Sequence, residues 1–178
     1  LRAADGRLVP VETRLVVGRW NGRPALFGVS RDISAHRLMA RELSESKRVL
    51  QAVLDAVPMR IFWKDKDSRF LGCNPLFARD AGKSDPAELL GQDDRAMAWA
   101  AQADLYRADD RRVMESGVAK LNFEEPQTTP DGRTIYLRTS KVPLRNASGE
   151  VVGVLGLYDD ITATKHAELA LQQRDRYQ

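Results

Sequence analysis

The sequence predicts an α+β domain in which helices cover one face of a single antiparallel β-sheet. Segments typical of strands lie at both ends of the predicted domain, residues 58–162, and segments typical of short helices lie between them. Short polar loops join neighbouring strand segments, and such loops favour antiparallel hairpins. The expected order is therefore two strands, three helical segments and three strands.

The sheet is expected to have five strands. They cover residues 60–63, 69–73, 119–128, 133–144 and 150–159. Together these segments are rich in β-branched and aromatic side chains, which pack well on a pleated surface. Asp131-Gly132 and the segment from Asn146 to Gly149 have the composition of turns, so they separate the last three strands.

The helical segments begin at capping residues. Asn74-Pro75 and Asp85-Pro86 each place a capping side chain before a proline, a combination typical of a first helical turn. Gly82 and Gly91 keep the two helices short. A longer helical stretch is expected from about Asp94 to Ser116, and the sequence leaves open whether it breaks near Ala100.

Two further helices are expected outside the domain. Residues 35–57 form a linker helix that ends before a proline, and residues 163–178 form an exit helix. The linker has a heptad pattern in which five of seven a and d positions are apolar, with His36 and Ser46 as the exceptions. This pattern fits a short two-stranded coiled coil, and it also fits an amphipathic helix that packs on its own domain.

An internal repeat relates the N-terminus to the end of the domain. The segments from Asp5 to Ser34 and from Asp131 to Thr162 share Asp-Gly-Arg at their start and Asp-Ile-Ser/Thr at their end, with matching Thr, Val and Gly residues between. The second copy is longer by two residues, which fit in its turn. Residues 1–34 are therefore expected to be the last two strands of a truncated preceding domain. A chance likeness of two amphipathic hairpins is the alternative.

Composition excludes several classes of function. The 178 residues include 28 Lys and Arg and 25 Asp and Glu, and the two signs alternate, so nucleic-acid binding is not expected. No apolar run reaches the roughly 18 residues of a membrane span, so direct membrane contact is not expected either. A single cysteine, Cys73, allows no internal disulfide and, with two histidines, no Cys/His zinc site. A reducing, cytoplasmic compartment fits this composition.

Several short motifs follow one another in a set order. They are Phe70-Leu71-Gly72-Cys73-Asn74-Pro75-Leu76-Phe77-Ala78, Leu90-Gly91, Arg107-Ala108-Asp109-Asp110-Arg111-Arg112-Val113-Met114-Glu115-Ser116-Gly117, Pro130-Asp131-Gly132-Arg133, Val151-Val152-Gly153-Val154-Leu155-Gly156 and Asp160-Ile161-Thr162. Their order and spacing resemble those of a bacterial PAS (Per-Arnt-Sim) sensory domain over about residues 46–162. The resemblance implies a PAS-like five-stranded sheet with flanking linker helices. It also implies adjacent PAS and output domains, the output being a histidine kinase, a diguanylate cyclase or a phosphodiesterase.

A mostly apolar pocket for a small molecule is expected between the sheet and the helices. Its candidate lining residues are Trp63, Cys73, Phe77, Met97, Trp99, Tyr106, Phe123, Tyr136 and Arg138. The same side chains also fit a plain core. Arg138 either points inward towards an anionic group or pairs with Glu124 on the neighbouring strand, and the pairing is the favoured interpretation.

No catalytic group of residues is expected. Asp93-Asp94 fits the capping of a helix start, and Asp109 to Arg112 fits a solvated helix face. Cys73 fits a small core residue. His166 lies in the exit helix and lacks the following acidic residue and the proline of a kinase phosphoacceptor motif, so it fits linker surface.

Haem and flavin are not expected as cofactors. The resemblance implies that a haem-binding relative has a histidine on its long helix, and residues 94–117 contain none. It also implies Asn-Cys-Arg-Phe in a flavin-binding relative, and the reversed Cys73-Asn74 does not match. An unidentified small molecule is the remaining ligand.

We therefore expect a sensory or relay module of a longer signalling protein, with a sensor histidine kinase as the favoured parent and no enzymatic activity in this piece. Asp160, Ile161 and Thr162 are expected to pass a shift of the last strand to the exit helix. The competing interpretation is a ligand-free dimerisation module. In either case the linker helices are expected to join two copies.

Overall fold

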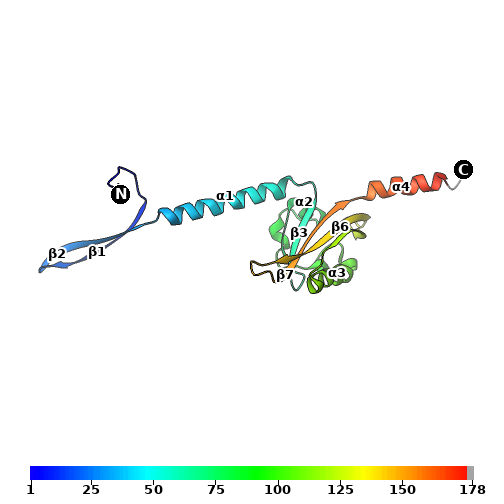
Figure 1. The fold of residues 1–178 in the computed structure, drawn as a ribbon. Coiled ribbons are helices and arrows are strands. Elements are labelled where there is room, and N and C mark those ends of the chain that lie inside the picture. The colour runs from blue at the N-terminus through cyan, green and yellow to red at the C-terminus, as the bar shows by residue number, and fades with distance from the viewer. Residues whose placement is uncertain (176–178) are drawn as a thin grey trace. The chain divides into compact units, whose positions relative to one another are not determined.

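The computed structural model describes residues 1–175 and divides the chain into two compact units, Leu1–Ala52 and Val53–Gln178. The first unit holds the hairpin of β1 (Val11–Trp20) and β2 (Arg23–Asp32) and most of helix α1 (Ser34–Ala56). The second unit holds a five-stranded sheet and its helices (Figure 1).

The sheet of the second unit is antiparallel throughout. Its strands are β3 (Arg60–Asp65), β4 (Phe70–Cys73), β5 (Lys120–Thr128), β6 (Thr134–Arg145) and β7 (Val151–Asp160). The strand order is β4-β3-β7-β6-β5, so the last strand of the domain lies at the centre of the sheet. The five strands and the α+β class predicted from the sequence are confirmed.

Short helices and one longer helix cover one face of this sheet. They are α2 (Pro75–Asp80), the 3₁₀ helices η1 (Pro86–Leu89), η2 (Asp94–Ala96) and η3 (Ala100–Gln102), and α3 (Ala103–Ser116). Helix α2 contacts β3, and α3 contacts β6 and β7 (Figure 1). An exit helix, α4 (Thr162–Asp175), follows β7. The prediction of a helix through the end of the chain falls partly on residues 176–178, outside the described residues.

The helical stretch expected from about Asp94 to Ser116 is interrupted, and the break that the sequence left open near Ala100 is present. The chain is extended at Met97, with φ −100° and ψ 168°, and forms separate turns before α3. Met97 and Trp99 are two residues apart, so in one continuous helix they would lie about 200° apart around the axis. The break allows both side chains to point into the core, where both are buried.

Glycines allow the central strands to approach closely. A Cβ atom on Gly153 would lie 2.0 Å from the backbone oxygen of Lys64, and one on Gly156 would lie 2.1 Å from Cζ of Phe62. Neither position has room for a side chain. The two glycines that interrupt the apolar sequence of β7 therefore bring β3 and the Phe62 ring against β7.

The N-terminal hairpin has the same register as β6 and β7. Val11 pairs with Asp32 in the hairpin, and their equivalents in the repeat, Leu137 and Asp160, pair in the sheet. The hairpin nevertheless has exposed apolar side chains on both faces. They are Leu15, Val16, Val17, Trp20, Leu26, Phe27 and Val29.

Candidate functional site

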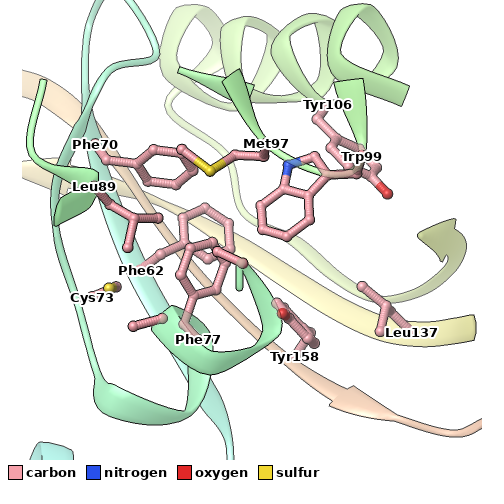
Figure 2. Close-up of a cluster of buried hydrophobic side chains, with 12 residues drawn as sticks. Phe62, Phe70, Cys73, Phe77, Leu89, Met97, Trp99, Tyr106, Leu137 and Tyr158 are labelled. Carbon is pink, nitrogen blue, oxygen red and sulfur yellow. The ribbon is translucent and has the colours of Figure 1, made fainter. Parts of the chain in front are cut away.

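Aromatic rings fill most of the space between the sheet and the helices (Figure 2). Phe77 of α2 lies at the centre of the cluster. Its ring centroid is 4.9 Å from that of Phe62, 5.4 Å from that of Phe70 and 5.7 Å from that of Trp99. Phe77 is positioned there because Asn74 caps α2 by accepting a hydrogen bond from the Phe77 N–H group at 3.1 Å.

Four buried charges lie beside this aromatic cluster. Nζ of Lys64 on β3 lies 2.6 Å from Oδ2 of Asp94 and 2.9 Å from Oδ2 of Asp110 on α3. Nζ of Lys141 on β6 lies 2.7 Å from Oδ1 of Asp110. All four side chains are almost inaccessible to solvent. Two ammonium groups and two carboxylates balance one another, so the interior holds no net charge from this network.

Further hydrogen bonds fix the four charged groups. Nε1 of Trp99 donates to Oδ1 of Asp94 at 3.0 Å, and Lys141 donates to the backbone oxygen of Tyr106 at 3.1 Å. Burial by itself would raise the pKa of the Asp110 carboxyl, but Lys64 and Lys141 together outweigh burial and hold that pKa below its usual value. The network therefore connects two strands of the sheet to the helices that cover them.

A second chain of polar contacts, which is partly buried, starts at α2. Oδ2 of Asp80 accepts hydrogen bonds from Nε of Arg60 at 3.0 Å and from the hydroxyl of Tyr158 at 2.9 Å. Burial raises the pKa of the Tyr158 hydroxyl well above its usual value, and the charge of Asp80 adds to this effect. The hydroxyl therefore stays protonated and donates to Asp80.

The interior retains a cavity of only about 20 Å³. It is lined by Phe62, Lys64, Phe77, Asp94, Trp99, Tyr106, Glu125, Gln127, Lys141 and Tyr158. A space of this size holds about one water molecule. The structure therefore leaves no room for a small organic molecule unless side chains move.

Three buried polar atoms near this cavity have no hydrogen-bond partner in the described part of the chain. They are Oε2 of Glu125, Nε2 of Gln127 and Oγ1 of Thr139. Burial raises the pKa of the Glu125 carboxyl, and the charge of Lys141 only partly opposes this.

The structure brings only some of the nine predicted lining residues together. Phe77, Trp99 and Tyr106 line the cavity, and Cys73 and Met97 are buried in the aromatic cluster without lining it. The Trp63 ring packs over Gly72 on the other face of the sheet, since a Cβ on Gly72 would lie 2.2 Å from Cζ2 of Trp63.

The other three predicted residues also lie away from the cavity. The Phe123 ring lies 3.9 Å from Nζ of Lys120, and Tyr136 is 38% exposed. Arg138 is exposed too. It lies opposite Glu124 in the register, but Glu124 forms its ion pair with Lys165 of α4, at 2.5 Å. The favoured pairing of Arg138 with Glu124 is therefore replaced by a contact between β5 and the exit helix.

Charged residues are the part of the interior that sequence reasoning missed. Asp93 does cap η2, accepting a hydrogen bond from the Arg95 N–H group at 3.0 Å, but Asp94 is a buried ion-pair partner. Asp109 and Asp110 are buried as well, so the predicted solvated face is wrong at both positions. The one available signal was Lys141, which follows Leu137 and Thr139 at every second position of a strand whose inner face is buried.

The sequence-predicted relay residues form a compact corner at the end of β7. Oδ1 of Asp160 accepts hydrogen bonds from the Thr162 N–H group at 2.9 Å and from the Thr162 hydroxyl at 2.5 Å. The Thr162 oxygen in turn accepts from the Tyr136 N–H group at 2.9 Å, and the Ile161 N–H group donates to the Tyr136 oxygen at 2.8 Å. The first turn of α4 is thus bonded to β6 as well as to β7.

A matching corner lies where α1 meets the sheet. The Asn74 side chain donates to the backbone oxygens of Leu54 at 3.2 Å and Met59 at 2.7 Å, and it accepts from the Ile61 N–H group at 3.1 Å. Because it also caps α2, one buried amide joins the end of α1 to β3 and α2. Its capping role was predicted; its contacts with the linker were not.

The chain offers little reactive chemistry. Burial raises the pKa of the Cys73 thiol to about 11, so it is a poor nucleophile at neutral pH. Within residues 1–175, no three His, Cys, Asp or Glu side chains gather closely enough to hold a metal ion. No helix in the described part of the chain has the length and apolar character needed to cross a membrane.

Comparison with known protein families gives a match to the PAS fold over residues 54–166. The chain belongs to the PAS family. The matched range covers the whole five-stranded sheet, both corners and the first residues of α4.

PAS relatives are found within signalling proteins. The chain is 32% identical over 136 residues to the methanogenesis regulatory histidine kinase FilI of Methanothrix harundinacea. The aligned region covers 76% of this chain and 15% of that protein. The chain is also 29% identical over 135 residues to the aerobic respiration control sensor protein ArcB of Escherichia coli. That alignment covers 71% of this chain and 16% of ArcB. The chain thus spans less than a fifth of these relatives and is homologous to the PAS sensory domains of sensor histidine kinases.

Solved structures share the fold. The PAS domain of Bordetella pertussis BvgS aligns with a TM-score of 0.54 at 22% identity, covering 75% of this chain and 97% of that one. A structure of VqmA bound to DPO aligns with a TM-score of 0.58 at 24% identity, covering 61% and 55%. At these identities the likeness supports the PAS fold alone.

Proposed function

We propose that this PAS domain relays a conformational signal from α1 to α4, and that its parent is a sensor histidine kinase. The observation that carries the proposal is the pair of hydrogen-bonded corners, one at each end of the domain. Asn74 joins the last turn of α1 to β3, and β3 pairs with β7. Strand β7 leads to Asp160 and Thr162, which hold the first turn of α4. A continuous backbone route therefore links the two helices through the centre of the sheet.

The small interior cavity favours relay over direct detection of a ligand. A molecule larger than water would have to displace aromatic rings or separate the buried ion pairs. Detection of a small molecule in the interior is the second candidate function, and the unpartnered atoms of Glu125 and Gln127 favour it. Native mass spectrometry of the chain purified from its host distinguishes the two. We expect the bare mass, and a retained small molecule would replace the relay proposal with ligand sensing.

Thr162 provides a direct test of the relay. Replacing Thr162 with Val keeps the shape of the side chain but removes the hydroxyl that bonds Tyr136 and Asp160, whereas Thr162→Ser keeps the hydroxyl. In the parent protein we expect signal-dependent phosphoryl transfer to lose its dependence on the signal in Thr162→Val and to keep it in Thr162→Ser. Normal regulation in Thr162→Val would count against the relay.

The N-terminal hairpin belongs, in this proposal, to a second PAS domain of the parent. Its register equals that of β6 and β7, and its exposed apolar faces need the rest of a sheet and its helices to cover them. Together with the free thiol of Cys73, this supports a cytoplasmic protein with PAS domains in tandem. In the parent, we expect slow amide exchange in β1 and β2; fast exchange there would contradict the second domain.

A further inference from the structure

Glu125 is a buried carboxyl without a counter-ion. It lies on the inner face of β5, is 8% exposed, and lines the small interior cavity. Its Oε2 atom has no hydrogen-bond partner, and within the described residues its carboxylate forms no ion pair. The four charges of the neighbouring network already balance one another, so an ionised Glu125 gives the interior a net negative charge.

The lysines nearest to Glu125 already have partners. Nζ of Lys141 lies 2.7 Å from Oδ1 of Asp110. Nζ of Lys120 lies 2.9 Å from Oδ1 of Asp109, and the Lys120 side chain is 43% exposed. Either lysine can pair with Glu125 only by leaving a buried aspartate, and separating a buried ion pair is costly.

The surroundings of Glu125 together favour its neutral form. Burial has the largest effect, and it raises the pKa of the Glu125 carboxyl above its usual value. Lys141, the Thr139 hydroxyl and Lys120 favour the ionised form, and they only partly oppose burial. The charge of Asp109 adds to the effect of burial.

The other ionisable groups around the cavity do not change this balance. Burial raises the pKa of the Tyr106 and Tyr158 hydroxyls, so both are neutral. Lys64 and Asp94 form an ion pair with each other at 2.6 Å. A proton therefore neutralises the Glu125 carboxyl without the separation of any ion pair.

Strand β5 is placed to respond to the charge of Glu125. It is an edge strand of the sheet, and its register with β6 shifts between Lys120 and Phe123. Glu124 points to the opposite face of the strand and forms an ion pair with Lys165 of α4 at 2.5 Å. Glu125 also lines a surface hollow together with Glu124 and Lys165, so a small movement of β5 admits water to the carboxyl. The same movement pulls on the contact between β5 and α4.

We propose that Glu125 is a proton-binding site through which pH controls the contact of α4 with the sheet. With the proton bound, β5 stays in place and Glu124 holds Lys165. When pH rises and the proton is lost, the buried negative charge loosens β5, water reaches the carboxylate, and the ion pair of Glu124 with Lys165 opens. The Lys141–Asp110 pair stays closed. This site gives the domain an input of its own and does not depend on the relay from α1.

Nuclear magnetic resonance of the whole chain measures proton binding and its effect on α4 separately. Isotope labelling of the glutamate carboxyl carbons follows Glu125, and the backbone amide resonances of Thr162 and Lys165 follow α4. Glu125→Gln assigns the Glu125 signal and keeps the side chain neutral at every pH. Glu115→Gln is the matched control, because Glu115 is an exposed glutamate. His166→Gln is present in every sample, so the imidazole of α4 cannot produce the response.

Between about pH 4 and about pH 9, we expect Glu125 to titrate with a midpoint above the ordinary range of a glutamate. The amides of Thr162 and Lys165 should shift with the same midpoint. These shifts should be lost in Glu125→Gln and kept in Glu115→Gln. A Glu125 midpoint within or below the ordinary range would overturn the proposal, and so would α4 shifts that persist in Glu125→Gln.

Lys165→Met separates the proton site from its effect on α4. The substitution removes the contact with Glu124 and leaves in place the charges that act on Glu125. We expect Glu125 to titrate as before, whereas the Thr162 amide loses its pH-dependent shift. An unchanged shift of Thr162 would overturn the switch, because α4 would then not follow β5 through this ion pair. Loss of signal relay from α1 changes none of these outcomes, so the two proposals can fail independently.

Discussion

Replacing Asp110 with Asn tests whether the buried charge network holds the helices on the sheet. The substitution keeps the size and shape of the side chain and removes one negative charge. Asp109→Asn is the matched control, because Asp109 is its neighbour on α3 and is also buried. The two residues differ in their ion-pair partners. Lys64 and Lys141, the partners of Asp110, are buried, whereas Lys120 and Arg112, the partners of Asp109, are exposed to solvent.

The expected magnitude follows from the partners that remain. Without the Asp110 charge, Lys64 still has Asp94 at 2.6 Å, but Lys141 loses its ion pair with Asp110 and retains uncharged acceptors, among them the Tyr106 carbonyl at 3.1 Å. The interior then carries an uncompensated positive charge. Breaking a buried pair in this way costs about 3–5 kcal/mol of the free energy of unfolding. Asp109→Asn leaves cations that water can solvate, so we expect a loss of about 1 kcal/mol.

Urea unfolding at pH 7, followed by tryptophan fluorescence, measures both variants; urea is chosen because it does not screen charge. With a slope of about 2 kcal/mol per molar, the midpoint should fall by roughly 1.5–2.5 M in Asp110→Asn and by about 0.5 M in Asp109→Asn. If Asp110→Asn does not fold, the double variant Asp110→Leu, Lys141→Met removes the stranded charge, keeps the Lys64–Asp94 ion pair, and should fold again. Equal midpoints for the two single variants would refute the reasoning.

Two further predictions concern the neighbourhood of the cavity. Because the pKa of Glu125 is raised in the folded state, its contribution to stability is present below the unfolded pKa and is lost as pH rises through the folded pKa. Glu125→Gln should therefore stabilise the domain by about 1 kcal/mol at pH 7 and by much less at pH 4, as thermal unfolding at the two pH values will show; an equal effect at both would contradict the assignment. Gly153→Ala should destabilise the domain by about 3 kcal/mol or more, because its Cβ meets the Lys64 backbone, whereas Gly149→Ala, in an open turn with positive φ, should cost only about 1 kcal/mol. Similar urea midpoints for the two alanine variants would show that the strands can separate without penalty.

The fold could be predicted because its signals are local. Asn74 before Pro75 marks the start of α2, and the turn residues after Leu144 mark the last hairpin, with no knowledge of distant parts of the chain. The ion-pair network has no local signal. Lys64, Asp94, Asp110 and Lys141 come from four elements, and each alone has the composition of a surface residue. The energetic cost of burying each charge is offset only because the four side chains form ion pairs with one another in the folded structure.

The same contrast explains the outcome for the pocket residues. An aromatic residue in a strand is as compatible with one face of the sheet as with the other until the register is known. Trp63 and Phe62 are adjacent, and it is Phe62 that points to the helices while Trp63 packs on Gly72. Strand β3 has consecutive apolar residues, so both of its faces carry apolar side chains. Its sequence therefore does not show which of Phe62 and Trp63 faces the helices.

The buried network also bears on how a signal could pass through the domain. Moving α3 away from the sheet would separate Asp110 from two ammonium groups at 2.9 and 2.7 Å, and moving η2 would separate Asp94 from one at 2.6 Å. Each separation carries the cost of a stranded buried charge, several kcal/mol, which is comparable to the whole free energy of a conformational switch. The corners at Asn74 and Thr162 are held instead by four hydrogen bonds each, and a hydrogen bond is worth about 1 kcal/mol. A signal of modest energy is therefore expected to shift the strand ends and the helices attached to them, while the interior stays closed.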